Sequence, residues 1–254
     1  MLPVLFHLGP LKLHTYGLLV AMGFYLGFFW TQKEFHLRSL PLSLLETLLV
    51  GIVAFGLLGA RVFYYLTTGH LELKTDPLSF FKIWEGGLVF YGGFIFVLLF
   101  LAIFSRLKKL PFLKIADAFV PGLFLGHALG RLGCFGSGCC YGKPSELPWA
   151  VMFKNIEALA PSFVRLHPTQ LYEFFLNLIF FALAAVLSRR LKKTGLLSVF
   201  YLLGYALVRF TVEIFRGDDR GHFFFGFSPS QILSMLMIIF GMGMFIYVQR
   251  KSDN

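Results

Sequence analysis

The sequence has few charged residues: Asp, Glu, Lys and Arg make up 14% of its 254 positions, against about 25% in an average soluble domain. Apolar residues make up 57%, and the chain contains 33 phenylalanines. A soluble domain rarely carries so much apolar side chain, because little polar surface would remain to face water. The composition therefore argues against a soluble protein and indicates one that is solvated by lipid.

Several short functional signals are also absent. No Gly-rich phosphate loop followed by Lys-Ser or Lys-Thr occurs, which argues against ATP use. No Cys-x-x-Cys pair supports zinc, and we predict neither a metal nor a cofactor. The first residues lack a basic region and a small-residue cleavage site, so the first apolar run is expected to be retained.

Long apolar runs are what the sequence does contain. Several of them approach the roughly 20 residues that a helix needs to cross a bilayer. We predict an all-α polytopic membrane protein, a bundle of about seven transmembrane helices in a single domain of residues 1–254. The connection at residues 133–167 is too polar to span and is expected as an outer-face loop. The expected spans are residues 14–30, 45–66, 87–104, 115–132, 168–187, 195–215 and 228–248.

The loops between these runs hold most of the basic residues behind the net charge of +10. This placement argues against nucleic acid as a partner. One set of alternating loops carries twelve Lys and Arg residues, and the other set carries eight. Because cytoplasmic loops are enriched in Lys and Arg, we predict an outside N-terminus and a cytoplasmic C-terminus.

Charged residues inside the expected spans are the most informative feature, because such charges are costly and usually functional. They are expected towards the outer leaflet. Arg209 and Glu213 are four residues apart and share a helix face, so an intrahelical ion pair that eases insertion is one interpretation. It does not explain the arginines on other helices, and an anionic phospholipid headgroup is a natural partner for them. The set is Arg61, Arg131, Glu173, Arg209 and Glu213.

Two histidines are candidates for proton transfer. His127 lies in an expected span, where a lone histidine is more often a hydrogen-bonded core residue. His167 lies where a loop enters the fifth span, just before Pro168, a residue that favours the first turn of a helix. His167 is therefore a candidate base or phosphate ligand.

A glycine-rich run at residues 126–142 contains all three cysteines, Cys134, Cys139 and Cys140. Glycines at this density allow sharp turns and expose backbone N–H groups to anions, although a flexible helix exit explains them equally well. The cysteines have several interpretations: small buried side chains, a disulfide from Cys134 to Cys139 or Cys140, or a catalytic thiol. The sequence leaves these alternatives open.

Five motifs, in order along the chain, resemble the prolipoprotein diacylglyceryl transferase family, and the similarity covers nearly the whole length. The motifs are His14–Gly17, Trp84–Gly87, Gly130–Gly133 with Gly142, His167–Glu173 and Tyr205–Arg216.

This resemblance implies a transferase of the bacterial cell inner (cytoplasmic) membrane. Its members take diacylglyceryl from phosphatidylglycerol, a membrane lipid. They attach it to the lipobox cysteine in the signal peptide of a preprolipoprotein and release glycerol phosphate.

The resemblance and the expected depth of the residues together suggest site roles. Arg131 and Arg209 would hold the phosphate, Glu213 would orient Arg209 or the glycerol hydroxyls, and Tyr16 would donate a hydrogen bond near the headgroup. The base would be His167 or His127. Further candidates for substrate binding are Arg61, Gly142, Gln170 and Glu173.

The chain departs from the family pattern at four positions. Tyr91 stands where the family usually has His, and Cys134, Ser137 and Cys139 stand where it has polar residues. Three other functions therefore stay open: a transporter or flippase for an anionic lipid or small anion, a membrane thiol-redox protein that uses the cysteines, and a paralogue that binds phospholipid without catalysis.

Overall fold

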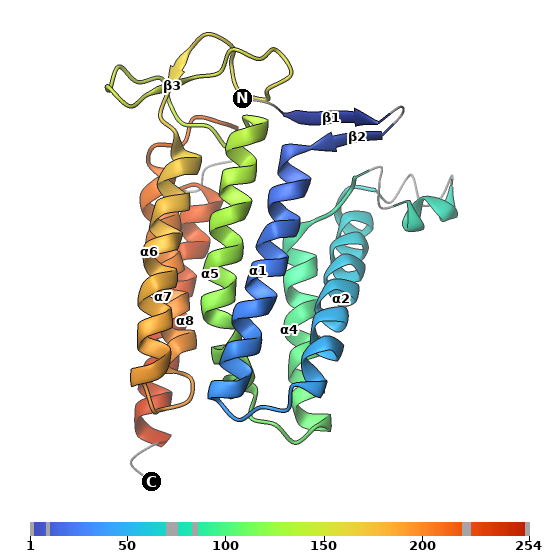
Figure 1. The fold of residues 1–254 in the computed structure, drawn as a ribbon, viewed down its shortest axis with the longest axis vertical. Helices are drawn as coiled ribbons and strands as arrows, with labels where there is room; N and C mark the ends of the chain where they lie inside the picture. Colours follow the sequence, from blue (N-terminus) through green and yellow to red (C-terminus); the bar gives the residue numbers. More distant parts are fainter. Residues whose placement is uncertain (1–2, 9–10, 70–75, 83–85, 220–224, 252–254) are drawn as a thin grey trace. The chain divides into compact units, whose positions relative to one another are not determined.

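The computed structural model describes residues 3–8, 11–69, 76–82, 86–219 and 225–251. This part of the chain is mostly helical (Figure 1). Besides a short 3-10 helix, η1 (Pro77–Phe81), it contains the α-helices α1 (Thr15–Leu37), α2 (Ser43–Thr67), α4 (Phe90–Leu107), α5 (Phe112–Ser137), α6 (Thr169–Arg190), α7 (Leu196–Glu213) and α8 (Pro229–Lys251).

Each helix overlaps one of the predicted spans, which confirms the all-α prediction. Five of them, α2, α5, α6, α7 and α8, are long and apolar enough to cross a membrane. The apolar helix α4 is shorter. Helix α5 ends at Ser137, so residues 133–137, predicted to begin the outer loop, are helical.

Two short antiparallel strand pairs were not predicted. Strands β1 (Val4–Leu8) and β2 (Leu11–His14) form a hairpin just before α1. Strands β3 (Val151–Met152) and β4 (Arg165–Leu166) pair within the connection between α5 and α6. Both pairs are too short to show the alternating pattern that would predict strands from sequence.

The chain forms two compact units, residues 38–115 and residues 1–37 with 116–254. In the first unit α2 packs against α4 through small residues: a Cβ on Gly59 would collide with the carbonyl oxygen of Gly92, and a Cβ on Gly92 with that of Gly59. The ring of Phe55 stacks on that of Phe100 with their centroids 4.9 Å apart. Such close contact between backbones is typical of helix pairs in membranes.

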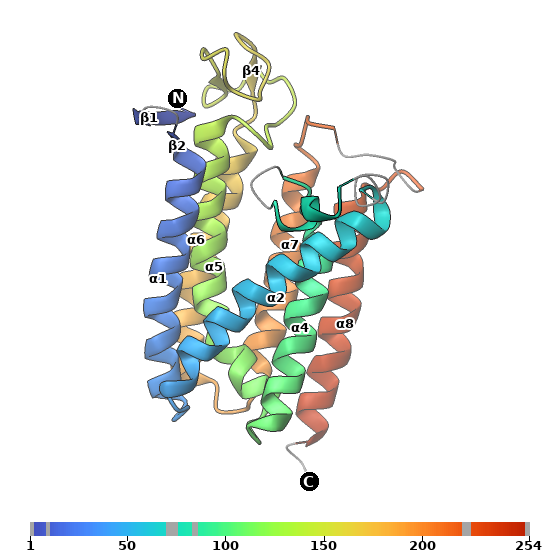
Figure 2. The same ribbon diagram turned by 90° about the vertical axis from the view of Figure 1, so that its right-hand side faces the viewer.

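In the second unit α1 and α5 lie side by side (Figures 1 and 2), again through glycines. A Cβ on Gly122 would lie 2.8 Å from the carbonyl oxygen of Gly27. Near the same end of α5, Asp117 accepts hydrogen bonds from the backbone N–H groups of Gly195 (2.6 Å) and Ser198 (2.7 Å). Asp117 thereby caps the start of α7, whose first N–H groups have no partner within the helix.

An aromatic core joins α5, α6 and α7. Phe124 is fully buried, and its ring centroid lies 5.5 Å from that of Phe180 and 4.9 Å from that of Tyr201. The segment between α5 and α6, with β3 and β4, lies beyond the ends of these two helices (Figures 1 and 2), and the end of α8 lies at the opposite end of the same unit. The core thus fixes the three helices whose charged residues meet close to the β3–β4 segment.

Candidate active site

Glu173 of α6 is the centre of a buried charged cluster. Its carboxylate is fully buried, and Oε2 lies 2.6 Å from Nε of Arg131 on α5. Its other oxygen, Oε1, lies 2.8 Å from Nη1 of Arg209 on α7 and 3.7 Å from Nη1 of Arg216. One carboxylate therefore holds guanidinium groups from two other helices and from the segment after α7.

Glu213 is the second carboxylate of the cluster. Its Oε2 lies 3.0 Å from Nη2 of Arg209, one helical turn away, which is the pairing expected from the spacing. Ser228 donates a hydrogen bond to Oε1 of Glu213 (2.8 Å), and Arg209 donates to Oγ of Ser230 (2.9 Å). Arg209 is thus fixed by two carboxylates and a hydroxyl.

Arg216 joins the cluster, although the sequence did not single it out as a site residue. Its side chain is buried and donates two hydrogen bonds to Asp218, of 2.7 and 2.6 Å. Burial disfavours the charge of Arg216, but the hydrogen bonds of Asp218 and the proximity of Cys140 outweigh it and raise the pKa of Arg216. The signal that could have identified it is its position at the end of the Tyr205–Arg216 motif.

The three arginines differ in how far they can reach a ligand. The side chain of Arg131 is 18% exposed, that of Arg209 12% and that of Arg216 2%. With Glu173, Glu213 and Asp218 the cluster is formally neutral, because three carboxylates balance three guanidinium groups. An anion would therefore bind through arginine N–H groups that the carboxylates do not use, and Arg131 is the most accessible source of these.

The two candidate histidines have aromatic partners. Nε2 of His127 lies 2.9 Å from the hydroxyl of Tyr201, and its ring centroid is 4.6 Å from that of Tyr205. Nδ1 of His167 lies 3.1 Å from the hydroxyl of Tyr172. The backbone of His167 also accepts a hydrogen bond from the N–H of Gly142 (3.0 Å), which ties the end of the glycine-rich run to the start of α6.

The glycine-rich run is held on α6 by side chains. Thr169 donates to the carbonyl oxygen of Cys140, and Gln170 donates to that of Cys139, both at 2.8 Å. Oε1 of Gln170 is buried without a hydrogen-bond partner among the described residues. Hydrogen bonds with Cys134 and Cys139 lower the pKa of Cys140, and the charges of Arg216 and Arg131 lower it further.

Tyr16 lies in the first turn of α1 and is half-exposed. A Cβ on Gly133 would lie 3.2 Å from its ring, so Tyr16 packs against the end of α5 that carries Arg131 and Cys134. Its placement is consistent with the predicted role near the headgroup, which stays a prediction.

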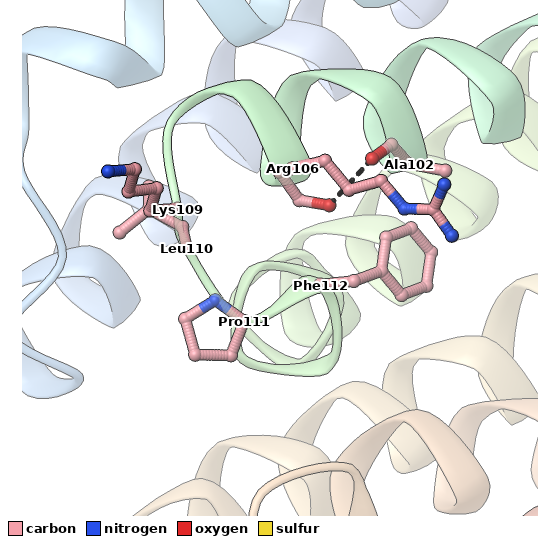
Figure 3. Close-up of a pocket in the computed structure, with 7 residues that line it drawn as sticks. Ala102, Arg106, Lys109, Leu110, Pro111 and Phe112 are labelled. Atoms are coloured by element: carbon pink, nitrogen blue, oxygen red, sulfur yellow. Dashed lines mark hydrogen bonds between the residues drawn. The ribbon is translucent and has the colours of Figure 1, made fainter.

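A pocket of about 470 Å³ opens beside the charged cluster, within the usual size range for small-molecule sites. Residues after α7 and before α8 form most of it. Its charged and polar lining residues include Lys143, Glu213, Arg216, Ser228 and Gln231. A second pocket lies at the end of α4 and is lined by Arg106, Lys109 and Phe112 among others (Figure 3). It contains none of the predicted site residues.

The predicted residues Arg61 and Tyr91 belong to the other compact unit. Arg61 is buried, and its five N–H groups donate to five backbone carbonyl oxygens, among them those of Ser79 (2.6 Å) and Lys82 (2.8 Å). These contacts give it a role in holding residues 79–82 and 86–87; substrate binding by Arg61 stays a prediction. Tyr91 lies exposed in the first turn of α4. Trp84 and Glu85 lie outside the described residues.

The comparison with known proteins decides the family. The sequence profile described as prolipoprotein diacylglyceryl transferase matches residues 3–247. This chain belongs to the prolipoprotein diacylglyceryl transferase family. The chain is therefore a multi-pass membrane protein, as its apolar helices indicate, and the resemblance seen in its motifs is confirmed.

Relatives from several bacteria match almost end to end. The phosphatidylglycerol–prolipoprotein diacylglyceryl transferase of Bordetella avium is 37% identical over 259 residues, covering 99% of this chain and 96% of the relative. Those of Bordetella bronchiseptica (35% identity, 98% and 95% covered) and Clostridium tetani (34% identity, 96% and 97% covered) are similar to nearly the same extent.

Proposed function

We propose that this chain transfers diacylglyceryl from phosphatidylglycerol to the lipobox cysteine of a preprolipoprotein signal peptide, in the inner membrane of a bacterium. The chain matches relatives over nearly its full length, and these relatives are named phosphatidylglycerol–prolipoprotein diacylglyceryl transferase. The single structural observation that supports the proposal is the buried cluster of Arg131, Glu173 and Arg209 on three helices. Arginine N–H groups at that place suit the phosphate of a lipid headgroup.

Arg131 is the proposed phosphate ligand. Its ion pair with Glu173 is made through Nε, and although Tyr205 also hydrogen-bonds to Arg131, a guanidinium carries five N–H donors. The remaining donors can hold the phosphate and stabilise the negative charge that develops on it as glycerol phosphate leaves.

Glu173 and Arg209 act as positioning residues in this proposal. Glu173 fixes the guanidinium of Arg131 from a fully buried position, and Arg209 fixes Glu173 from the other side. Neither residue needs to touch the lipid. Together they hold Arg131, the phosphate ligand, in one orientation, and a fixed orientation favours the reactive geometry.

The reaction is a displacement at the glyceryl carbon that carries the phosphate. The acceptor thiol loses its proton, its sulfur forms a bond to this carbon, and the carbon–oxygen bond breaks. The electron pair stays on the oxygen of glycerol phosphate, whose charge is neutralised by Arg131 and by a proton. Only the thiolate is a strong enough nucleophile for this step.

His167 is the better placed of the two candidate bases. It lies in the loop before α6 beside Gly142, whereas His127 lies within α5 against Tyr201 and Tyr205. In the tautomer whose Nδ1–H donates to the hydroxyl of Tyr172, 3.1 Å away, Nε2 is free of hydrogen and can accept a proton from the thiol. A general base must reach the thiol within hydrogen-bond distance, and His167 is proposed to do so once the acceptor is bound.

A transfer assay tests the proposed function. The purified chain in detergent would be mixed with phosphatidylglycerol labelled in its acyl chains and a peptide that contains a lipobox. Transfer to this peptide, with stoichiometric release of glycerol phosphate and no transfer to a peptide with serine in place of the cysteine, is the expected result. Tight binding of phosphatidylglycerol without transfer would instead identify a lipid-binding paralogue.

A further inference from the structure

The three cysteines form a cluster to which the proposed mechanism gives no role. The sulfur atoms of Cys134, Cys139 and Cys140 all lie within 4.8 Å of one another. All three are free thiols, and they are the only cysteines of the chain. The sequence places the three cysteines in one short run and allows a disulfide from Cys134, but the approach of all three sulfurs to one another was not predicted.

The backbone brings the three sulfurs together at a cost. Gly138 has φ +75° and Cys140 has φ +62°, so left-handed residues flank Cys139 on both sides. This conformation is unfavourable by about 1 kcal/mol or more for a non-glycine residue. It is held in place by the buried side chains of Thr169 and Gln170, which bind the carbonyl oxygens of Cys140 and Cys139. Strain that is maintained by buried partners often marks a functional site.

The sulfur spacing suits a metal ion better than a disulfide. Zinc binds thiolates at about 2.3 Å in a tetrahedral arrangement, which places ligand sulfurs roughly 3.8 Å apart. A disulfide requires sulfurs about 2.05 Å apart. From separations of up to 4.8 Å, the three thiols need to move much less to bind an ion than to form a covalent bond.

We propose that Cys134, Cys139 and Cys140 bind one Zn²⁺ ion whose fourth position accepts the thiol of the incoming lipobox cysteine. Three protein ligands with an open fourth position are the pattern of catalytic rather than structural zinc. The role of the fourth position rests on the proposed transferase function, whereas binding of the ion by the three thiols does not.

The surrounding charges fit such a site. Zn²⁺ with three thiolates carries a net charge of −1, and cationic groups beside it stabilise that charge. Arg216 interacts directly with Cys140, and Arg131 interacts with Cys134 and Cys140. The same Arg131 is the proposed phosphate ligand, so the zinc-bound thiol and the leaving phosphate would lie next to each other.

The ion would help to generate the thiolate. A thiol that coordinates zinc loses its proton, and His167, the proposed base, would accept it. The bound sulfur then forms the bond to the glyceryl carbon while the carbon–oxygen bond to the phosphate breaks. Glycerol phosphate leaves with the electron pair and takes up a proton from solvent.

Metal binding is measured first, on the full chain in detergent under reducing conditions. Zn²⁺ would be titrated against a chromophoric chelator; one ion per chain is expected. Replacement of any one cysteine by serine should weaken Zn²⁺ affinity by more than about a hundredfold. Loss of a residue that only hydrogen-bonds to a metal ligand already weakens affinity by up to about a hundredfold, and loss of a ligand itself should weaken it more. Ser137→Ala lies in the same run, keeps all three thiols and serves as the matched control, with unchanged affinity.

The open position is tested with Co²⁺ in place of Zn²⁺. Thiolate-to-cobalt charge-transfer bands should appear, and they should grow when a lipobox peptide is added but not when the peptide with serine is added. If the reduced chain bound neither Zn²⁺ nor Co²⁺, the proposed site would be wrong. It would also be wrong if protein taken from membranes had only one free thiol per chain, because the other two cysteines would then form a disulfide. Metal binding without a response to the cysteine peptide would overturn the open position.

The transfer assay separates this inference from the proposed function. Removal of Zn²⁺ by a chelator should abolish transfer by the wild-type chain, and added Zn²⁺ should restore it. Full transfer by the metal-free chain would leave the transferase intact and refute the role of zinc. Absence of transfer by the zinc-loaded chain would refute the transferase, while the binding titration would still report on the site itself.

Discussion

Arg131 is paired with a buried carboxylate, as its neighbours are, but it is the most exposed arginine of the cluster. If it holds the phosphate, Arg131→Ala should lower kcat/KM for phosphatidylglycerol by about a hundredfold or more, the usual loss for a group that stabilises developing negative charge. Arg131→Lys should recover little, because an ammonium group cannot reproduce the planar array of donors.

The assay is transfer of label to a lipobox peptide. Arg190→Ala, which removes an exposed arginine from the last turn of α6, is the control and should retain full activity. Wild-type turnover by the Arg131→Ala chain would exclude this residue as the phosphate ligand.

Glu173 is expected to affect stability as well as activity. It is fully buried, and three arginines lie within 4 Å of its oxygens. Glu173→Gln keeps the shape but leaves Arg131 and Arg216 without this shared counter-charge, so unfolding in detergent should become easier by about 3–5 kcal/mol. The measurement is the thermal midpoint of the purified chain. An unchanged midpoint with lost activity would show that Glu173 acts on the substrate rather than on the arginines.

The sequence singled out four of the residues that meet in the charged cluster, but it missed Arg216 and predicted only one of the pairings. The i,i+4 pair of Arg209 and Glu213 follows from helix geometry and was predicted. The contacts of Glu173 with arginines from α5 and α7 depend on which helix faces meet, and that depends on packing around Phe124, which no local pattern encodes. The cysteine cluster depends on two residues in the left-handed conformation, Gly138 and Cys140, and only the glycine could be suspected from sequence.

At the scale of helices, length and apolar content were sufficient to locate each α-helix that the structure describes. The predicted span at residues 195–215 corresponds to α7 (Leu196–Glu213) and that at 168–187 to α6 (Thr169–Arg190). The end of α5 was missed because the connection at residues 133–167, taken as a whole, is too polar to span. A Cβ at Gly136 would lie 2.7 Å from the side chain of Thr15, so this glycine serves close packing against the start of α1 within a continuing helix.

Close packing of α1 on α5 yields a prediction for the helix pair. A Cβ at Gly122 would lie 2.7 Å from Oγ1 of Thr31 and 2.8 Å from the carbonyl oxygen of Gly27. Gly122→Ala should therefore push the helices apart and destabilise the chain by about 1–3 kcal/mol. Gly130→Ala on the same helix, where a Cβ would have no neighbour within 4 Å, is the matched control and should not lower the thermal midpoint. Equal midpoints for both variants would rule out a contribution of this contact to stability.

At the scale of the whole molecule, the charges of the loops and the placement of the site must indicate the same orientation of the chain in the membrane. Acceptor signal peptides and the outer leaflet are reached from outside the cytoplasm, so the proposed reaction requires the β3–β4 segment to lie at the outer face. The distribution of Lys and Arg predicts the same orientation independently. Both arguments concern α6, which connects this segment to the basic loop that contains Lys192.

Two single cysteines placed at either end of α6 test that orientation. In a chain whose three native cysteines are replaced by serine, Glu157→Cys and Lys192→Cys both lie at exposed positions. A membrane-impermeant maleimide added to intact spheroplasts should label the chain with Glu157→Cys and leave the chain with Lys192→Cys unlabelled, and both should react after permeabilisation. The reverse pattern would place Arg131, Glu173 and the cysteines at the cytoplasmic face. The proposed reaction with secreted signal peptides would then be untenable, because the acceptor cysteine and the site would lie on opposite sides of the membrane.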